Sequence, residues 1–228
     1  MPPDRVFELR NYLLRPGQRD VLIDLFEREF IESQETLGAH VVGAFRDLDR
    51  PDHFVWIRGF ADFASRLAAL DGFYAGPVWQ AHRMEANATM LDTGNVLLLR
   101  PLSGSLARAP HARPPVGAAS SPGSLFVVAT YFVEAGGERA FAAAFDREIA
   151  PRIREGGGEL IATLATEPGA NNYPRLPVRE DVNVLVAVAR YQRLDAFAAW
   201  PRGASLEGRL SAPTEIMRLQ PTPRSLLR

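Results

Sequence analysis

Three side chains in the first half of the chain have the chemistry needed to polarise or deprotonate a bound molecule. They are Tyr12, Arg58 and His82. A tyrosine hydroxyl donates a hydrogen bond to a carbonyl or phenolic oxygen, an arginine stabilises negative charge, and a histidine exchanges protons near neutral pH. We therefore take them as candidate catalytic residues. Each also has a structural interpretation, because ion pairs, space-filling tyrosines and hydrogen-bonded histidines are common in protein interiors.

A second group of side chains could line a binding site. Its members are aromatic and charged residues: Glu8, Arg10, Phe54, Trp56, Trp79 and Tyr131. Aromatic rings beside arginines suit an apolar or aromatic molecule that carries an acceptor group. The alternative for the charged members is an internal network in which Glu8 pairs with Arg10 and Arg58. Such a network is expected at buried positions, because an unpaired buried charge is very unfavourable.

His82 is also the residue that could bind a cofactor. It shares helical spacing with Trp79, Ala86 and Met90, so this stripe should face the sheet. One hypothesis makes His82 an axial haem ligand, and the alternative is a hydrogen-bonded histidine in a packed seam. No second haem signal accompanies it, and the histidines and carboxylates lack metal-site spacing. We therefore expect no cofactor and no metal.

The composition of the 228-residue chain excludes several other classes of chemistry and partner. It has no cysteine and no lysine, which excludes thiolate ligands, disulfides and Schiff-base catalysis. Its net charge of −1 gives no reason to expect nucleic acid or an anionic membrane as a partner. No apolar run is long enough to span a bilayer, and no signal peptide is visible. We expect a cytoplasmic protein.

The elements that must position these residues occur twice in the chain. Glu8–Phe30 aligns with Val127–Ile149 without a gap, and Tyr12 falls on Tyr131. A repeat of this length is a whole small domain rather than a solenoid unit. The sequence predicts one repeat over residues 1–102, a Pro/Ala/Gly-rich linker over 103–123 and a diverged repeat over 124–228. An insertion at 167–180 is either a pocket rim or a decorated surface turn.

Hydrophobic spacing predicts the order strand, helix, strand, strand, helix, strand in each repeat. The predicted strands of the first repeat are 5–14, 40–47, 54–60 and 96–101, with helical segments at 18–36, 62–74 and 77–90. Those of the second are 125–133, 159–166, 182–191 and 215–220, with helices at 138–155 and from 195. This βαββαβ order is typical of ferredoxin-like domains, which pack helices on one face of the sheet.

Alternation in the first-repeat strands separates an apolar row from a mixed row. The apolar row includes Phe7, Leu9, Val55 and Ile57, and the mixed row includes Glu8, Arg10, Tyr12, Trp56 and Arg58. We expect the apolar row to lie under the helices. The mixed row is too aromatic for water, so we expect it to face the second repeat, against a face that includes Val127, Ala129, Tyr131, Val184, Val186 and Val188. The predicted fold is α+β, with two tandem ferredoxin-like repeats packed sheet to sheet as a dimeric α+β barrel.

Two segments of the first repeat resemble NIPSNAP-type domains. VFELRNYLLRPGQ has the aromatic-Glu-x-Arg-x-Tyr strand and glycine turn, and HFVWIRGFADFASRLAALDGFYAGPVW has the Trp-containing strand and later Pro-x-Trp. The resemblance covers 5–101, whereas the second repeat has Val127 and Ala129 where Glu8 and Arg10 stand. It implies the dimeric α+β barrel superfamily, in which a homodimer is one expected assembly. It brings no agreed catalytic residues.

These observations support three hypotheses of function. The first is a NIPSNAP-family protein of undefined activity that binds a small apolar or aromatic molecule in an internal barrel cavity. The second is a cofactor-independent monooxygenase or isomerase acting on a quinol-like or polyketide-like substrate, with Tyr12, His82 and Arg58 polarising it or moving protons. The third is an interaction protein with a solid barrel. The sequence does not decide whether the chain is an enzyme.

Overall fold

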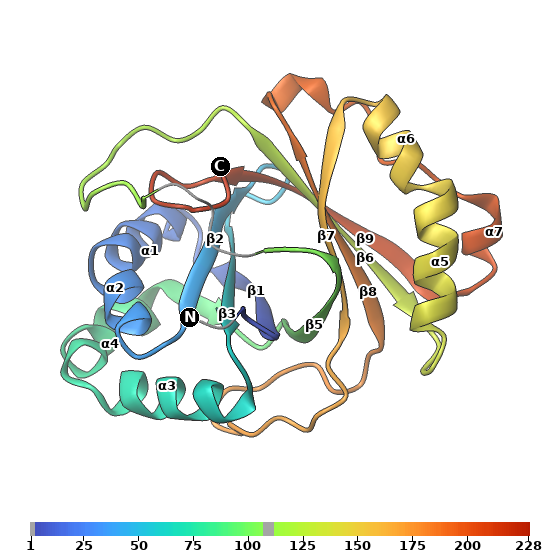
Figure 1. Cartoon of the computed structure of the whole chain (residues 1–228). Coiled ribbons are helices and arrows are strands. Elements are labelled where there is room, and N and C mark those ends of the chain that lie inside the picture. Colours follow the sequence, from blue (N-terminus) through green and yellow to red (C-terminus); the bar gives the residue numbers. More distant parts are fainter. Residues whose placement is uncertain (1–2, 107–111) are drawn as a thin grey trace.

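Eight antiparallel strands close into one barrel in the computed structural model, which describes residues 3–106 and 112–228 (Figure 1). Their order is β3-β2-β9-β6-β8-β7-β5-β1, and β1 pairs with β3 to complete the ring. The strands are β1 (Val6–Leu14), β2 (His40–Asp47), β3 (His53–Phe60), β5 (Val96–Gly104), β6 (Leu125–Val133), β7 (Gly158–Thr166), β8 (Val184–Tyr191) and β9 (Leu210–Pro221). A short strand, β4 (Met90–Asp92), extends the end of β1.

The two halves of the chain meet edge to edge. The first half contributes β5-β1-β3-β2 and the second contributes β9-β6-β8-β7. β2 then pairs with β9, with Phe45 opposite Pro221, and β5 pairs with β7, with Leu99 opposite Thr166. Closing a sheet in this way removes the unpaired edges that would otherwise be exposed. The predicted α+β barrel is confirmed at this level.

Helices cover the outside of the barrel in two groups (Figure 1). The first half contributes α1 (Arg19–Leu25), a π-helical segment η1 (Phe26–Phe30), α2 (Ile31–Glu35), α3 (Phe63–Ala75) and α4 (Pro77–Thr89). The second half contributes α5 (Glu138–Glu148), α6 (Ala150–Glu155), a 3-10 turn η2 (Leu194–Ala196) and α7 (Ala204–Glu207). The side chain of Asp62 caps α3 by accepting a hydrogen bond from the Ser65 backbone N at 2.7 Å. No helix in the described parts of the chain combines the length and apolar character that a bilayer crossing requires.

The inside of the barrel is filled by aliphatic and phenylalanine side chains from both halves. They include Phe7, Leu9, Phe45, Val55, Ile57, Leu99, Phe126, Val128, Leu164, Val184, Val186, Val188 and Leu219. The prediction that the mixed row lies between the two sheets is therefore wrong. Tyr12, Phe54 and Trp56 instead form a core with Phe26 and Phe30 under the first-half helices.

The reversal has a physical cause in what each neighbour can offer. The second-half strands present mostly apolar side chains to the barrel interior, so the mainly apolar row packs there. Its buried polar member, Asn11, is hydrogen-bonded to His53 and Met217. The helices carry polar residues, including Gln34 and Arg66, that pair with the charges of the mixed row. The charged row therefore faces the helices.

The predicted inner face of the second half combined residues from both faces of its sheet. Val127, Ala129 and Tyr131 pack under the second-half helices, whereas Val184 and Val186 face the barrel interior. In the first half, the register of β2 against β3 shifts between Val41 and Gly43. A β-bulge of this kind interrupts alternation, so residues on either side of it no longer follow one simple row.

Candidate functional site

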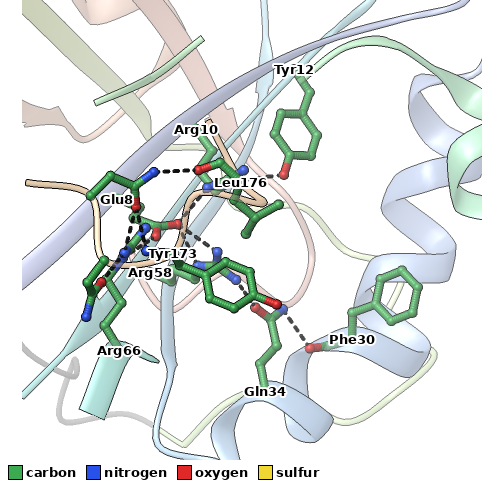
Figure 2. A network of polar contacts seen from close by, with 11 residues as sticks. Glu8, Arg10, Tyr12, Phe30, Gln34, Arg58, Arg66, Tyr173 and Leu176 are labelled. Carbon is green, nitrogen blue, oxygen red and sulfur yellow. Dashed lines mark hydrogen bonds and ion pairs between the residues drawn. The ribbon is translucent and has the colours of Figure 1, made fainter. Parts of the chain in front are cut away.

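The Glu8 carboxylate lies among three buried arginines beneath the first-half helices (Figure 2). Its Oε2 atom accepts hydrogen bonds from Arg10 Nη1 at 2.7 Å and from Arg58 Nε at 2.8 Å. Its Oε1 atom accepts one from Arg66 Nε at 2.7 Å. All four side chains are 0% exposed. We call these four residues the arginine cluster.

Strand register and helix position assemble the arginine cluster. β1 and β3 pair with Glu8 opposite Arg58, and Arg10 follows on the same face of β1 because side chains alternate along a strand. Arg66 comes from α3, whose buried face covers these strands. Burial opposes the charged carboxylate, but the three guanidinium groups outweigh it and hold the pKa of Glu8 well below its usual range. Glu8 is therefore an anion at neutral pH.

Neutral side chains satisfy further donors of the cluster. Arg10 Nε donates to the Tyr12 hydroxyl oxygen at 2.8 Å, and Arg58 Nη1 donates to Gln34 Oε1 at 2.7 Å. Because the Tyr12 oxygen accepts this bond, its own proton points elsewhere, and no described residue accepts that proton. Tyr12 can thus donate to a bound molecule.

The 167–180 insertion of the second half reaches over this site. Arg66 Nη1 donates to Asn171 Oδ1 at 3.1 Å and to Asn172 Oδ1 at 2.5 Å. Tyr173 is buried and stacks on Tyr74, with ring centroids 6.1 Å apart. Leu176 of the same loop, drawn with the cluster in Figure 2, completes a cavity wall. The insertion is therefore part of the candidate site.

A cavity of about 120 Å³ lies between β1, β3 and the first-half helices. Its walls are Tyr12, Leu22, Phe26, Phe30, Gln34, Phe54, Trp56, Phe73, Tyr74, Trp79, Asn87, Met90, Thr93 and Leu176. We call it the aromatic cavity. Trp56 is central: its ring lies 5.9 Å from Tyr12 and 4.9 Å from Phe26, and its buried Nε1 has no hydrogen-bond partner among the described residues.

Positive charge lies directly behind this wall. The Arg58 guanidinium carbon is 5.0 Å from the Trp56 ring centroid, and that of Arg10 is 5.5 Å away. Both arrangements are within the range of a cation–π contact. The cavity therefore combines an apolar lining with two unused donors and a cationic background.

The structure brings together most, but not all, of the residues selected from the sequence. Tyr12, Phe54, Trp56 and Trp79 line the aromatic cavity, and Glu8, Arg10 and Arg58 lie behind its wall. His82 and Tyr131 lie outside this cavity.

His82 lies on α4 at the surface side of the core. Its Nε2 atom is 3.7 Å from a Glu29 carboxylate oxygen and its Nδ1 atom is 3.7 Å from that of Glu85. The ring also packs edge-on against Phe30, with centroids 6.3 Å apart. It does not line the aromatic cavity. Within the described residues, no group of three or more histidines and carboxylates is arranged to hold a metal ion.

Tyr131, which aligns with Tyr12 in the sequence, lies on β6 of the second half. Its hydroxyl oxygen accepts a hydrogen bond from Trp200 Nε1 at 2.6 Å. Burial raises the pKa of Tyr131 to about 12, although this hydrogen bond opposes the shift. It lines a separate, open cavity of about 490 Å³ with Ile149 and Leu206, so it cannot share a ligand with the first-half residues.

Sequence reasoning missed Arg66, Gln34 and the π-helical segment. Arg66 did leave a signal, because it shares helical spacing with the buried residues Ala69, Leu70 and Phe73. A charge on the apolar face of a helix indicates a buried partner. The π-helix leaves no comparable pattern, yet π-helical turns are rare and often occur at functional sites.

The π-helical segment Phe26–Phe30 interrupts the first helix where it passes over the cavity. Both terminal residues of the segment, Phe26 and Phe30, line the cavity. The extra residue in such a turn changes which side chains face inward. The interruption therefore contributes directly to the shape of the site.

Comparison by family model shows that residues 7–106 match the NIPSNAP family. A search of curated proteins by sequence finds no match. Three of the matching solved structures cover nearly the whole chain. A candidate monooxygenase from Fusobacterium nucleatum matches 97% of this chain and 94% of its own, with a TM-score of 0.60 and 10% identity.

A candidate monooxygenase from Lactobacillus acidophilus matches 95% of this chain and 93% of its own, with a TM-score of 0.58 and 12% identity. An anthrone oxidase-like protein matches 96% and 92%, with a TM-score of 0.57 and 10% identity. At these identities the likeness shows a shared fold, which hosts different chemistries in different proteins.

Proposed function

Residues 7–106 of this chain form a NIPSNAP domain, and we propose that this domain binds a small aromatic or apolar molecule in its aromatic cavity. The proposed position lies between the sheet and the first-half helices. It replaces the cavity expected inside the barrel, whose interior is filled by packed side chains.

The observation that carries this proposal is the pair of unused donors in an aromatic wall. Trp56 Nε1 is buried without a partner, and the Tyr12 hydroxyl accepts from Arg10 while its own proton lacks an acceptor among the described residues. A buried donor left unpaired costs about 1–3 kcal/mol. A ligand with an acceptor oxygen recovers that cost while its ring contacts the surrounding aromatic side chains.

The cavity volume limits the size of this ligand. At about 120 Å³, it is comparable with an engineered cavity of ~150 Å³ that holds benzene. A single substituted ring fits this volume, whereas a fused polyketide-like ring system requires the wall to open. The proposal therefore favours a quinol-like ligand over a polyketide-like one.

Calorimetric titration with phenol tests the binding proposal. We expect phenol to bind the native protein and to lose binding in Leu176→Trp, because the larger side chain enters the cavity from the insertion. The matched control is Leu194→Trp, which changes a residue in η2 of the second half. Equal phenol binding in native protein and in Leu176→Trp would contradict the proposal.

We keep oxidation of such a ligand as a second candidate function, because the Tyr12 hydroxyl and Arg10 are placed to move a proton and stabilise an anion beside the cavity. In this reaction a quinol and O2 would give a hydroxyquinone and water. One ring C–H bond becomes C–O, the quinol loses two electrons in becoming a quinone, and the second oxygen atom leaves as water. The electrons come from the substrate itself, so no further cofactor is required.

Oxygen uptake with a one-ring quinol tests this second function. We expect uptake by the native protein above the uncatalysed rate, and a large loss in Tyr12→Phe. Oxygen uptake should be unchanged in His82→Ala, because His82 does not line the cavity. This variant therefore distinguishes a role of Tyr12 from a role of His82, while Arg58 lies behind the cavity wall. Uptake that is unchanged in Tyr12→Phe removes the assignment of Tyr12, and uptake equal to the buffer rate removes the oxidase function.

We also propose that the halves are copies of one ferredoxin-like unit, with domains at 1–102 and 124–228 joined by a linker at 103–123. The same order of strands and helices in both halves supports this, and residues 107–111 of the linker lie outside the described residues. Superposition of the halves in experimental coordinates, with β1 on β6, tests it. The cytoplasmic location and the homodimer stay predictions.

A further inference from the structure

The arginine cluster contains more positive than negative charge. Arg10, Arg58 and Arg66 each carry a positive charge at any ordinary pH, and Glu8 is the acid with which all three pair. Among the described residues, no second carboxylate forms an ion pair with any of the three. The cluster therefore has a net charge of about +2 with every side chain 0% exposed.

Hydrogen bonds that the arginines donate to neutral groups do not cancel this charge. Tyr12, Gln34, Asn171 and Asn172 accept from the arginines, but each is neutral as an amide or a hydroxyl. Burial raises the pKa of the neighbouring Tyr74, so its phenol is also neutral at pH 7. Uncompensated buried cations are strongly unfavourable.

Unused donors accompany the excess charge. The Nη2 atoms of Arg10 and Arg66 are buried and have no hydrogen-bond partner among the described residues. Arg58 Nη2 lies 2.7 Å from Glu8 but without hydrogen-bond geometry. An arginine fork in this state is poised for a further acceptor, and charged acceptors bind most strongly.

One part of the aromatic cavity wall is in direct contact with the arginine cluster. Tyr12 and Gln34 line the cavity, and they are the side chains that bond directly to Arg10 and Arg58. An acidic group at this end of the cavity would be one side chain away from two guanidinium groups. Trp56, whose buried N–H has no partner among the described residues, lines the same cavity.

We propose that the ligand of the aromatic cavity is an anion, namely a small aromatic acid whose carboxylate lies at the Tyr12–Gln34 end. This inference rests on the proposed function, because it concerns the same cavity. The ring occupies the aromatic wall, and the acid group receives the Tyr12 and Trp56 donors. The excess charge of the arginine cluster favours the ionised acid over a neutral molecule of the same shape.

Titration with benzoate and benzamide tests the inference, because the two probes share one shape and differ in charge. At pH 7.5 and fixed ionic strength, we expect the native protein to bind benzoate at least about tenfold more tightly than benzamide. Equal or weaker binding of benzoate, with benzamide bound, overturns the anion inference and leaves the proposed function intact. If phenol binds but neither of these probes does, the anion inference fails and the proposed function stands. If none of the three binds, both fail.

Two variants test the source of the preference. Arg66 does not line the cavity, and Arg66→Met removes one of the two excess charges, so the benzoate-to-benzamide affinity ratio should fall severalfold. Arg66→Lys keeps the charge and should retain the ratio. A ratio that is the same in native protein, Arg66→Met and Arg66→Lys shows that the cluster does not set it and overturns the inference.

Discussion

At the scale of single residues, Glu8 allows three arginines to be buried beneath the helices. Its two oxygens accept hydrogen bonds from all three arginines. The neutral side chains accept hydrogen bonds from other N–H groups of these arginines. The consequence is an unequal dependence. Losing one arginine leaves two partners for the carboxylate, whereas losing the carboxylate leaves three buried cations without any counter-charge.

We predict that Glu8→Gln destabilises the protein by about 3–5 kcal/mol, because it removes the anion of a buried ion cluster. Urea unfolding of the variant and native protein measures this. The matched control is Glu29→Gln, whose partners Arg28 and His82 are both partly exposed and whose loss should cost less than about 1 kcal/mol. Equal costs for the two variants would contradict the prediction.

The depressed pKa of Glu8 also predicts a pH dependence. A carboxylate whose pKa is lower in the folded state stabilises folding at pH values above its unfolded value of 4.5. That contribution should be lost progressively as the pH falls below about 4.5. The free energy of unfolding of Glu8→Gln should change less over this range than that of the native protein, and parallel curves would exclude this role for Glu8.

At the scale of elements, the sequence predicts which segments form strands and helices better than it predicts which way they face. Alternation separates the row of Phe7 and Leu9 from the row of Glu8 and Trp56, but both rows need a covering partner. Which row faces the helices and which faces the barrel interior depends on the side chains of the covering element. Those residues lie far away in the sequence. Arg66 held the decisive signal, because its charge on an apolar helix face requires an acid such as Glu8 across from it.

The insertion loop shows a different limit of prediction from the sequence. Its asparagines were visible in the sequence, but their target lies in the other half of the chain, 105 and 106 residues away. A bulge such as that at Val41–Gly43 and the π-helical turn at Phe26–Phe30 are equally hidden. Each depends on a one-residue difference in hydrogen bonding, which leaves the residue types of the segment unchanged.

The Asn172 side chain joins the insertion loop to α3 through hydrogen bonds, so we predict that Asn172→Ala makes the loop more mobile. Its Oδ1 accepts from Arg66 and its Nδ2 donates to the Phe63 carbonyl at 2.7 Å. Loss of both bonds should cost about 1–3 kcal/mol and speed hydrogen exchange of amides in 167–180. Arg175→Ala, at an exposed position of the same loop, is the control. Unchanged loop exchange in Asn172→Ala would show that other contacts hold the loop.

At the scale of the whole molecule, the barrel depends on two seams that join the halves. One seam is β2 with β9 and the other is β5 with β7. Both halves also contribute to a single apolar interior, so neither sheet covers its inner face alone. Closure of the seams therefore supports the strands that carry the arginine cluster, since β1 lies next to β5 in the same ring.

Gly104 provides a test of this closure at the β5–β7 seam. Its φ of +67° is disfavoured for other residues, and a Cβ there would lie 2.1 Å from the carbonyl oxygen of Ile161 on β7. The backbone of β5 can approach β7 this closely only without a side chain. We therefore predict that Gly104→Ala destabilises the protein through both backbone strain and a clash at the seam.

Gly117→Ala separates these two effects, because Gly117 also has a positive φ, +84°, but a Cβ there would meet nothing within 4 Å. Strain alone should cost about 1–2 kcal/mol at each position, and the seam clash should add about 1–3 kcal/mol at Gly104. Urea unfolding measures both. If the two variants lose equal stability, the close contact of β5 with Ile161 contributes nothing, and closure must depend on the remaining pairs of the seam.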